Sequence, residues 1–552
     1  MKYAVAFLLI AAGAATSAFG QVPSSEEPGH IASRFETSLP PPRLPQGTIR
    51  LPQTVAPAGA DEIGLKLVRV TVVGSTIYDA ATLDALAAPL IGKTIRLSDL
   101  YALAAAITKR YGDDGYVLSR AVVVPQEIDP RHAGVTIRIS EAYIDRVEWP
   151  AEFSTYRDLF SGYAAKITAE HPSNINTVMR YLLLAGELPG FKVSSTFVAS
   201  ATNPNASTLK VTATATPVEA SAAIDNHGTE ARGPWEYVLS ATFNNVLHQH
   251  EALTATLAGS VQTKELTYGA LGYRQVLTNE GLTLFSDLSY SRGQPGTAAL
   301  EAVEFSSSSL EGDLGLSFPL IRTRDTRLTL AALAFFSDNL ADMLGSPSSD
   351  DRLRGVRFKA DLERDDDTGG HLAAGAVLSH GLPGLGASAN GTPLLSRANG
   401  RVDFTTMSVS AAYDHPLGDH FSAHVAASAQ LAGTPLLSPE ECGYGGKEFG
   451  RAFDPSEITG DDCALMSGEL RFNPSLPQLS IGALQFYAFA DYGRVFRIAP
   501  SFGTPSNDAG ASAGAGMRLT GDNYGLDVAA AKPLFGRADS GWRAFLSLSV
   551  HK

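Results

Sequence analysis

Residues 282–290 read LTLFSDLSY, and the polarity of their side chains alternates. The apolar positions are Leu282, Leu284, Leu288 and Tyr290. Because successive side chains of a strand point to opposite faces, the pattern predicts a β-strand with one apolar and one polar face. Strands of this kind are typical of a transmembrane β-barrel, in which the apolar face meets lipid and the polar face meets water.

The same alternation recurs from residue 219 to residue 552, where no helical period persists. Further examples are residues 237–243, 253–257, 328–334 and 545–550. A soluble β-sandwich would show the same period, but this segment is too long for one sandwich and its second face is small and polar throughout. With about 21 residues for each strand and its turn, we expect an antiparallel barrel of about 16 strands around a polar lumen.

The composition of the chain excludes two classes of function. Charged residues make up 18% of the 552 residues, and the net charge is −14. No Lys/Arg-rich block occurs, so the electrostatic attraction that dominates nucleic-acid binding is missing and we expect no nucleic-acid partner. After residue 20, no apolar run reaches the length of about 18 residues that a membrane-spanning helix requires. The chain is therefore not a helical membrane protein.

Residues 1–20 have the pattern of a secretory signal peptide. Lys2 precedes an apolar run from Ala4 to Ala15, and small residues lead up to Gly20. We expect cleavage near Gly20 and delivery to an oxidising compartment. No stop-transfer helix follows, so the mature chain is expected in the periplasm, outside the cell or in an outer membrane as a barrel.

The segment between the leader and the barrel changes pattern twice. Residues 21–63 are rich in proline, with three in a row at 40–42, and predict a semi-rigid linker interrupted by a short helix near residues 30–36. Residues 64–142 and 143–217 each read as a compact α/β module with the order β-α-α-β-β. The two modules repeat the order of elements and not the residues.

Four short motifs carry a resemblance to a known family. In the modules they are Gly115, Tyr116, Arg120, Pro125 and Gln126, and then Leu188, Pro189 and Gly190. In the barrel segment they are Gly450, Arg451, Ala452 and Phe453, and then Phe489, Asp491 and Gly493. In this order they resemble the two-partner secretion transporters of haemolysin secretion/activation type. These transporters are outer-membrane pores of the Omp85 superfamily with periplasmic POTRA modules.

The resemblance implies a specific contact in the barrel. In the family, the first barrel motif lies at the tip of the sixth extracellular loop, which folds back into the lumen, and its arginine pairs with the aspartate of the second motif. Arg451 and Asp491 would then form a bidentate, charge-assisted pair that fastens the loop to the wall. The family tip normally reads Val-Arg-Gly-Tyr or Val-Arg-Gly-Phe, so Ala452 departs from it, and Gly450 offers backbone freedom one residue earlier than usual. Residues 28–36 are similar to the N-terminal helix that some members carry as a pore plug.

Cys442 and Cys463 flank the same loop and are the only two cysteines of the chain. In an oxidising compartment we expect them to form a disulfide, which would stabilise the loop by about 3 kcal/mol. Two unpaired thiols are the alternative.

The resemblance also implies the biological role. Residues 218–552 would form the outer-membrane barrel of a Gram-negative-type envelope, and the two modules would lie in the periplasm. The protein would export one large secreted partner, an adhesin or a cytolysin, which the modules capture through their strand edges and the lumen passes in an extended state. Outer-membrane lipid is the other expected partner, and the protein is expected to act as a monomer. No enzyme activity, cofactor or metal is implied.

Three other functions are compatible with parts of the sequence. An assembly factor that inserts other barrels belongs to the same superfamily, and a passive porin shares the barrel without the modules. Residues 510–514 fit the Gly-x-Ser-x-Gly motif of serine hydrolases, but that motif requires a strand-turn-helix context. Strand-like sequence follows Ser512 here, so we do not expect a hydrolase.

Overall fold

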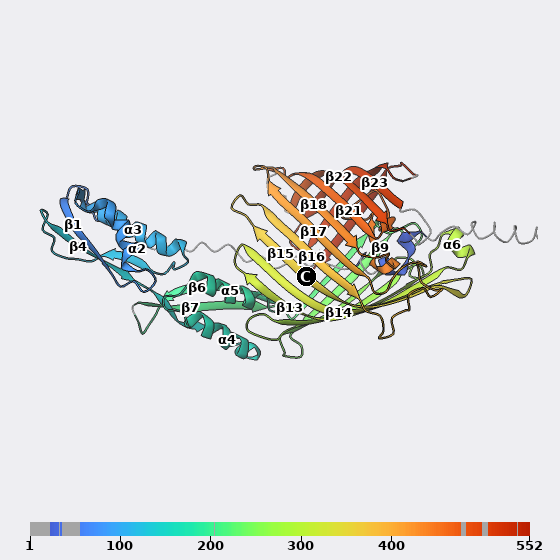
Figure 1. Cartoon of the computed structure of the whole chain (residues 1–552), viewed down its shortest axis with the longest axis horizontal. Coiled ribbons are helices and arrows are strands. Elements are labelled where there is room, and N and C mark those ends of the chain that lie inside the picture. The colour runs from blue at the N-terminus through green and yellow to red at the C-terminus, as the bar shows by residue number, and fades with distance from the viewer. Residues whose placement is uncertain are drawn as a thin grey trace, which may run out of the picture.

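The computed structural model describes residues 23–31, 34–35, 56–203, 205–475, 482–499, 506–537 and 539–552. The expected signal peptide and most of the expected linker lie outside the described residues. Along its longest axis the molecule runs from one α/β module through a second to a large barrel (Figure 1). No helix within the described ranges is long and apolar enough to cross a membrane.

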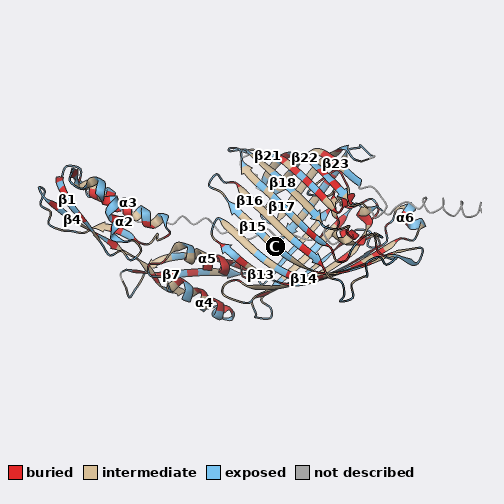
Figure 2. Ribbon diagram, viewed as in Figure 1, coloured by how far each residue is buried: buried red, intermediate tan, exposed pale blue. Residues whose placement is uncertain are grey.

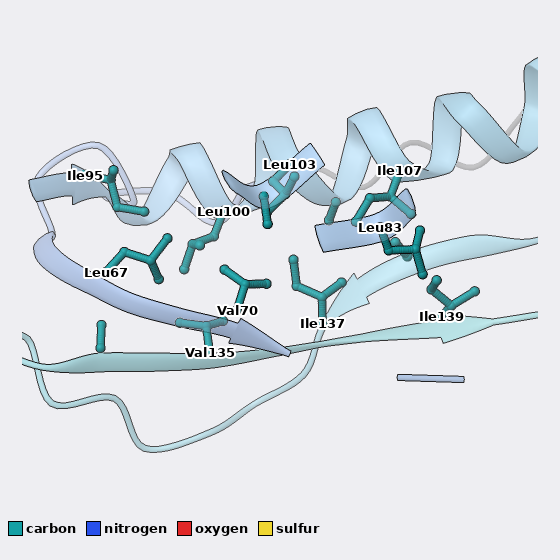
Figure 3. Close-up of a cluster of buried hydrophobic side chains, with 14 of the residues drawn as sticks. Leu67, Val70, Leu83, Ile95, Leu100, Leu103, Ile107, Val135, Ile137 and Ile139 are labelled. Atoms are coloured by element: carbon teal, nitrogen blue, oxygen red, sulfur yellow. The ribbon is translucent and has the colours of Figure 1, made fainter. Parts of the chain in front are cut away.

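The first module is a four-stranded sheet covered by two α-helices. Its elements are β1 (Gly64–Val73), α2 (Ala80–Ala87), β2 (Thr94–Arg96), α3 (Leu97–Asp113), β3 (Arg120–Val123) and β4 (Ala133–Ser140). Alternate side chains of β4, among them Val135 and Ile137, face Leu103 and Ile107 of α3 (Figure 3). The sheet order is β2-β1-β4-β3. Strand β2 was not expected, because three residues are too few to show alternation.

The second module contains the order β-α-α-β-β. Its elements are β5 (Tyr143–Glu148), α4 (Arg157–Thr168), α5 (Ile175–Gly186), β6 (Phe191–Ala199) and β7 (Ala206–Ala215). Helix α5 begins after Asn174, because the Asn174 side chain accepts a hydrogen bond of 2.9 Å from the backbone N–H of Asn176. The sheet order is β5-β7-β6, so β6 is an edge strand that pairs with β7.

The rest of the chain closes into a barrel of 16 antiparallel strands, as the alternation predicted. The first eight are β8 (Val218–Asp225), β9 (Glu236–Asn244), β10 (Glu251–Ser260), β11 (Thr267–Val276), β12 (Thr283–Gly293), β13 (Ser306–Arg322), β14 (Thr326–Met343) and β15 (Ser346–Asp365). The others are β16 (His371–Gly381), β17 (Thr405–Pro416), β18 (Phe421–Ala432), β21 (Asp462–Phe472), β22 (Ala483–Arg497), β23 (Ser506–Thr520), β24 (Tyr524–Phe535) and β25 (Arg543–His551). Strand β25 pairs with β8 and so closes the ring.

The two faces of the barrel differ in chemistry. Leu288 and Tyr290 of the stretch quoted first are exposed on the outer face, together with Leu271 on the neighbouring strand. On the inner face the hydroxyl groups of Thr242 and Thr254 lie 3.0 Å apart. In Figure 2 exposed residues, in pale blue, recur along the strands of the barrel between less exposed ones. The apolar outside and polar inside are the arrangement that a barrel in lipid requires.

The second module is attached to the end of the barrel where β8 begins, which we call the module end. Glu280, in the turn between β11 and β12, lies 2.8 Å from Lys166 and accepts a hydrogen bond of 3.0 Å from the Tyr181 hydroxyl. Arg322 at the end of β13 forms an ion pair of 2.5 Å with Glu187. These contacts join the module to successive turns of one side of the barrel.

The described N-terminal residues form two short 3-10 helices, η1 (Ser24–Glu26) and η2 (Pro28–His30). The sequence predicts a short helix near residues 30–36. His30 is the last residue of η2 and Arg34 also has 3-10 conformation, whereas residues 32, 33 and 36 lie outside the described residues, so the helix as a whole stays a prediction. Pro28 accounts for the break between the two helices, because proline has no N–H to continue a helical hydrogen-bond ladder.

Candidate functional site

A loop folded against the barrel wall forms the centre of the site. Loop 6 (residues 433–461) connects β18 to β21 and contains the hairpin of β19 (Cys442–Tyr444) and β20 (Ile458–Gly460). At its tip Gly450 has a left-handed backbone with φ +82°, and its carbonyl accepts a hydrogen bond of 2.8 Å from the Phe453 N–H. Gly450 thus supplies the positive φ that Ala452 could adopt only with strain.

Arg451 binds the wall through several hydrogen bonds to Asp491 of β22. Its Nη2 lies 2.7 Å from Oδ1 of Asp491, its Nε 3.1 Å from Oδ2, and its backbone N–H 2.9 Å from Oδ2. The side chain of Asp491 is fully buried and that of Arg451 nearly so. The guanidinium carbon also lies 3.6 Å from the ring centre of Phe489. A bidentate, charge-assisted pair stacked on an aromatic ring fixes both the position and the orientation of the loop tip.

The wall around this pair contains partners that the sequence did not indicate. Glu469 of β21 is an ion-pair partner of Arg451, and it also pairs with Arg471 at 2.7 Å and with Arg518 at 3.0 Å. The Ser512 hydroxyl donates a hydrogen bond of 3.0 Å to Oδ2 of Asp491. Ser512 lies within the continuous strand β23, so the Gly-x-Ser-x-Gly match is not a strand-turn-helix elbow.

Tyr444 of β19 is buried between the loop tip and the wall. A Cβ on Gly493 or on Gly510 would overlap its ring, so the glycines of β22 and β23 provide the space that the ring fills. Phe453 stands edge-on to the same ring, with 5.0 Å between ring centres. The glycine of the wall motif therefore has a steric role beside the electrostatic role of Asp491.

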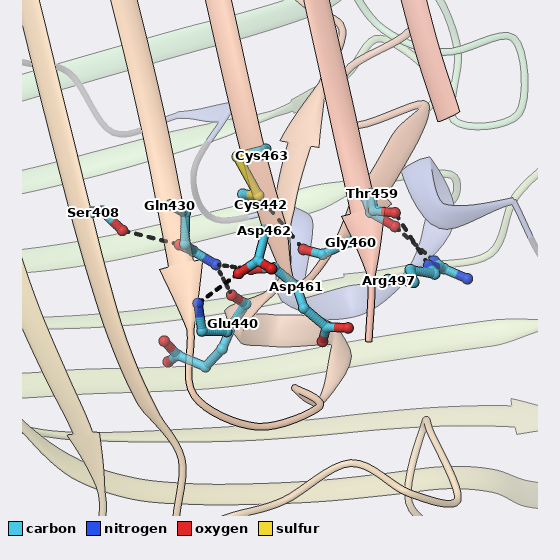
Figure 4. The surroundings of a disulfide bond; sticks show 11 residues. Ser408, Gln430, Glu440, Cys442, Thr459, Gly460, Asp461, Asp462, Cys463 and Arg497 are labelled. Carbon is cyan, nitrogen blue, oxygen red and sulfur yellow. Dashed lines mark hydrogen bonds between the residues drawn. A yellow bond between two sulfur atoms is a disulfide. The ribbon is translucent and has the colours of Figure 1, made fainter. Parts of the chain in front are cut away.

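The base of loop 6 is fastened covalently and by hydrogen bonds (Figure 4). Cys442 and Cys463 are joined by a disulfide, with 6.4 Å between their Cα atoms, which links β19 to barrel strand β21. The buried carboxylate of Asp461 pairs with Arg397 of loop 5 (residues 382–404) at 2.5 Å. Its oxygens also accept hydrogen bonds from the backbone N–H groups of Leu436 and Ile498, at 2.6 and 2.7 Å.

The N-terminal segment lies inside the barrel near the end opposite the module, which we call the distal end. Glu26 and Arg232 form a fully buried ion pair of 2.8 Å. Nη2 of Arg232 also donates a hydrogen bond of 2.7 Å to the Glu26 carbonyl. Ile31 and Phe35 pack against Tyr268 of the barrel wall.

The same segment touches loop 6. The Ser24 hydroxyl donates a hydrogen bond of 3.2 Å to the carbonyl of Glu457. Burial, and after it the neighbouring carboxylate of Glu441, raise the pKa of Glu27 to about 8. Burial lowers the pKa of His30 to about 4, and the charge of Arg34 acts in the same direction. Docking of the segment is therefore linked to the protonation of two of its side chains.

The module motifs do not gather at one place. Gly115, which precedes Tyr116, lies at the contact between the two modules, and Gly190, which follows Leu188 and Pro189, lies where the second module meets the barrel. Gln126 follows Pro125 beyond β3, and its amide accepts a hydrogen bond of 2.8 Å from the backbone of Thr136 and donates one of 2.9 Å to it. Arg120 begins β3 and is exposed.

Two protein-family models match the chain. "Haemolysin secretion/activation protein ShlB/FhaC/HecB" matches residues 205–519, and "POTRA domain, ShlB-type" matches residues 65–142. The outer membrane transporter CdiB of Escherichia coli is 24% identical over 468 residues, 80% of this chain and 75% of CdiB. The heme/hemopexin transporter protein HuxB of Haemophilus influenzae (strain 86-028NP) is 22% identical over 475 residues, 84% of this chain and 82% of HuxB.

Solved structures share the fold. CdiB from Escherichia coli has a TM-score of 0.70 at 20% identity, covering 91% of this chain and 94% of CdiB. BamA from Haemophilus ducreyi lacking POTRA domains 1–3 has a TM-score of 0.50 at 12% identity, covering 89% of this chain and all of that one.

A closed barrel of 16 strands, with α/β modules at one end and an inward loop fastened to its wall, is the fold of the outer membrane transporter CdiB. The matched segment is more than half of the chain, and the chain belongs to the haemolysin secretion/activation family (ShlB/FhaC/HecB). It is a two-partner secretion transporter that exports a secreted partner protein. Its modules lie in the periplasm, so the module end is periplasmic and the distal end is extracellular.

Proposed function

We propose that this chain exports one large exoprotein of adhesin or cytolysin type, which the modules capture and the barrel lumen passes in an extended state. The observation that carries the proposal is that Arg451 attaches loop 6 to the inner wall of a barrel whose periplasmic end bears the two modules. A loop held by side-chain contacts can move aside without unfolding the barrel. Membership of a family described by haemolysin secretion/activation favours the cytolysin class.

The proposed division of the chain has five parts. A signal peptide (1–20) and a linker (21–63) precede the modules at 64–142 and 143–217 and the barrel at 218–552. The starts of β1 at Gly64, of β5 at Tyr143 and of β8 at Val218 support the last three boundaries.

Strand β6 is the proposed capture edge. It is nine residues long and pairs with β7 on one side. In the first module, by contrast, the outer strands β2 and β3 have three and four residues. An extended client could add a strand to β6 and gain main-chain hydrogen bonds with little demand on its sequence.

Lipid and oligomeric state follow from the barrel. The exposed leucines of the outer face make outer-membrane lipid the second proposed partner. A closed ring of strands offers no unpaired barrel edge to another copy, which supports function as a monomer. We also propose transport without catalysis, since the hydroxyl of Ser512 is engaged by Asp491.

The test is deletion of the chain followed by comparison of culture supernatants and outer membranes. Loss of one large secreted polypeptide, restored by the wild-type chain and not by a chain without residues 64–217, supports export. Broad loss of outer-membrane proteins would instead support an assembly factor. A change in small-solute uptake alone would support a porin.

A further inference from the structure

The two module motifs each contain a glycine at an equivalent place. Gly115 follows α3, the last helix of the first module, and Gly190 follows α5, the last helix of the second. Both have a left-handed backbone, with φ +93° and +72°. The two modules therefore share a local conformation at the point where each faces the next unit of the chain.

At Gly115 the contact comes from the second module. A Cβ on Gly115 would lie 2.5 Å from Oδ1 of Asn174. The Gly115 carbonyl accepts a hydrogen bond of 2.8 Å from the backbone N–H of Ile175, and Nδ2 of Asn174 donates one of 3.1 Å to the Asp114 carbonyl. One asparagine thus caps α5 of its own module and binds the end of α3 in the other.

At Gly190 the same arrangement recurs with the barrel as partner. A Cβ on Gly190 would overlap the Thr216 carbonyl oxygen, which Asn244 binds, and would lie 2.6 Å from Nδ2 of Asn244, the buried last residue of β9. That Nδ2 donates a hydrogen bond of 2.9 Å to the Thr216 carbonyl, and the Gly190 carbonyl accepts one of 2.8 Å from the Thr216 N–H. The backbone N–H of Asn244 also donates a hydrogen bond of 2.9 Å to Pro217, in the link between β7 and β8.

We propose that Gly115 with Asn174, and Gly190 with Asn244, form two equivalent joints that set the angle of each module to the next unit, and that these four are positioning residues for export. A small contact between modules leaves relative motion as the default. A side-chain amide seated on a glycine removes that freedom, because the close approach is possible only without a Cβ. The glycines of the two module motifs then fix the orientation of the modules, and the exported protein binds to other surfaces of the modules.

The test measures distances by electron spin resonance in the full-length chain in lipid nanodiscs, with the native disulfide intact. Spin labels are placed at the exposed positions Asp129 in the first module, Asp158 in the second and Asp522 in a periplasmic turn. We expect Asn174→Ser to widen the 129–158 distance distribution by about twofold or more and to leave the 158–522 distribution unchanged. Serine retains the helix cap and loses the reach to Asp114, so the variant separates the joint from the stability of α5.

Asn244→Ala should have the opposite pattern and widen only the 158–522 distribution. Gly115→Ala has a matched control in Gly92→Ala, because Gly92 has a similar φ of +82° with nothing within 4 Å of its would-be Cβ. Gly115→Ala should widen the 129–158 distribution and Gly92→Ala should not. Distributions that do not change, or that widen at both joints with either asparagine variant, would overturn the proposal.

Export is the second measurement. Secretion should fall with Asn174→Ser and Asn244→Ala while the amount of barrel in the outer membrane stays constant. Only this consequence rests on the proposed function. The distances test the joints even if the exported client turns out to be of another class.

Discussion

The ring of Tyr444 occupies the space that a side chain at Gly493 would need. Gly493 lies two residues after Asp491 on β22, so one strand provides both the carboxylate for Arg451 and the space for the aromatic ring. The loop tip is thus held by charge and by shape at neighbouring positions of the same wall.

Gly493→Ala should displace Tyr444 and loosen loop 6. The expected cost is about 1–3 kcal/mol, as for an overpacked core position, and export should fall while heat-modifiable barrel remains in the outer membrane. Gly468→Ala on β21 is the control, because nothing lies within 4 Å of a Cβ there. Equal secretion by both variants would contradict the steric role of Gly493.

Arg451→Ala should reduce export more than it reduces the abundance of the barrel. Removing one partner leaves the buried Asp491 without its cation, which typically costs about 3–5 kcal/mol. Arg451→Lys should restore little, because an ammonium group cannot make the bidentate contact. Immunoblots of supernatant and outer membrane from the same cultures give the ratio of exported protein to barrel. A normal ratio in Arg451→Ala would mean that this pair does not control the loop.

Replacing both cysteines by serine should free the base of loop 6. The disulfide closes a loop with a sequence separation of 21 residues, which corresponds to about 3 kcal/mol in the chain-entropy account. The loop of the double variant should be cut by added protease at lower concentration than the wild-type loop. Thiol labelling of the denatured wild-type protein, without reductant, provides the control and should show no free cysteine.

Breaking the ion pair between Glu26 and Arg232 should release the N-terminal segment. Arg232→Met leaves the buried Glu26 without its ion-pair partner, whereas the double variant with Glu26→Gln leaves no unpaired charge. Pore conductance in planar bilayers should therefore rise most in Arg232→Met and less in the double variant. Identical conductance in wild type and Arg232→Met would show that the segment does not block the pore.

The pH dependence of pore opening follows from two pKa shifts of opposite sign. Docking of the N-terminal segment raises the pKa of Glu27 from 4.5 to about 8. The contribution of Glu27 to the stability of the docked segment is therefore complete below pH 4.5 and is lost as the pH rises through 8. Docking lowers the pKa of His30 from 6.5 to about 4, so this contribution is complete above pH 6.5 and is lost as the pH falls through 4. Between pH 4.5 and 6.5 a rise in pH therefore weakens docking through Glu27 and strengthens it through His30.

Above pH 6.5 only Glu27 continues to act, so conductance should rise between pH 6.5 and 8. Glu27→Gln should remove this rise and, between pH 4.5 and 6.5, leave the effect of His30 unopposed, so that conductance rises as the pH falls through this range. The same bilayer recordings over pH 4 to 9 measure both effects. If conductance rose equally in Glu27→Gln, the rise would be caused by another titratable side chain.

The barrel was predictable because lipid and water impose opposite chemistry on the two faces of each strand. Leu288 and Tyr290 report the lipid face directly, and the length of the alternating segment gives the strand number. The three residues of β2 and the turns broken by Pro28 were not predictable, since periodicity needs several residues and the N-terminal segment takes its shape from the barrel around it.

The site was only partly predictable, for a related reason. The resemblance pointed to Arg451 and Asp491, which the structure brings together. Glu469 and Ser512 lie beside them through the registers of β21 and β23 against β22, and no feature of the sequence gives these registers. The pairing of Glu26 with Arg232 likewise joins residues that are 206 positions apart and carry no motif.

The link between Cys442 and Cys463 restricts the kind of motion that the lumen loop can undergo. Residues 443–462 belong to a closed covalent ring whose base stays on β21. The tip can swing aside, but the loop cannot be pulled out along with a passing polypeptide. The disulfide is therefore a tether that keeps the base of the loop in place whichever position its tip takes.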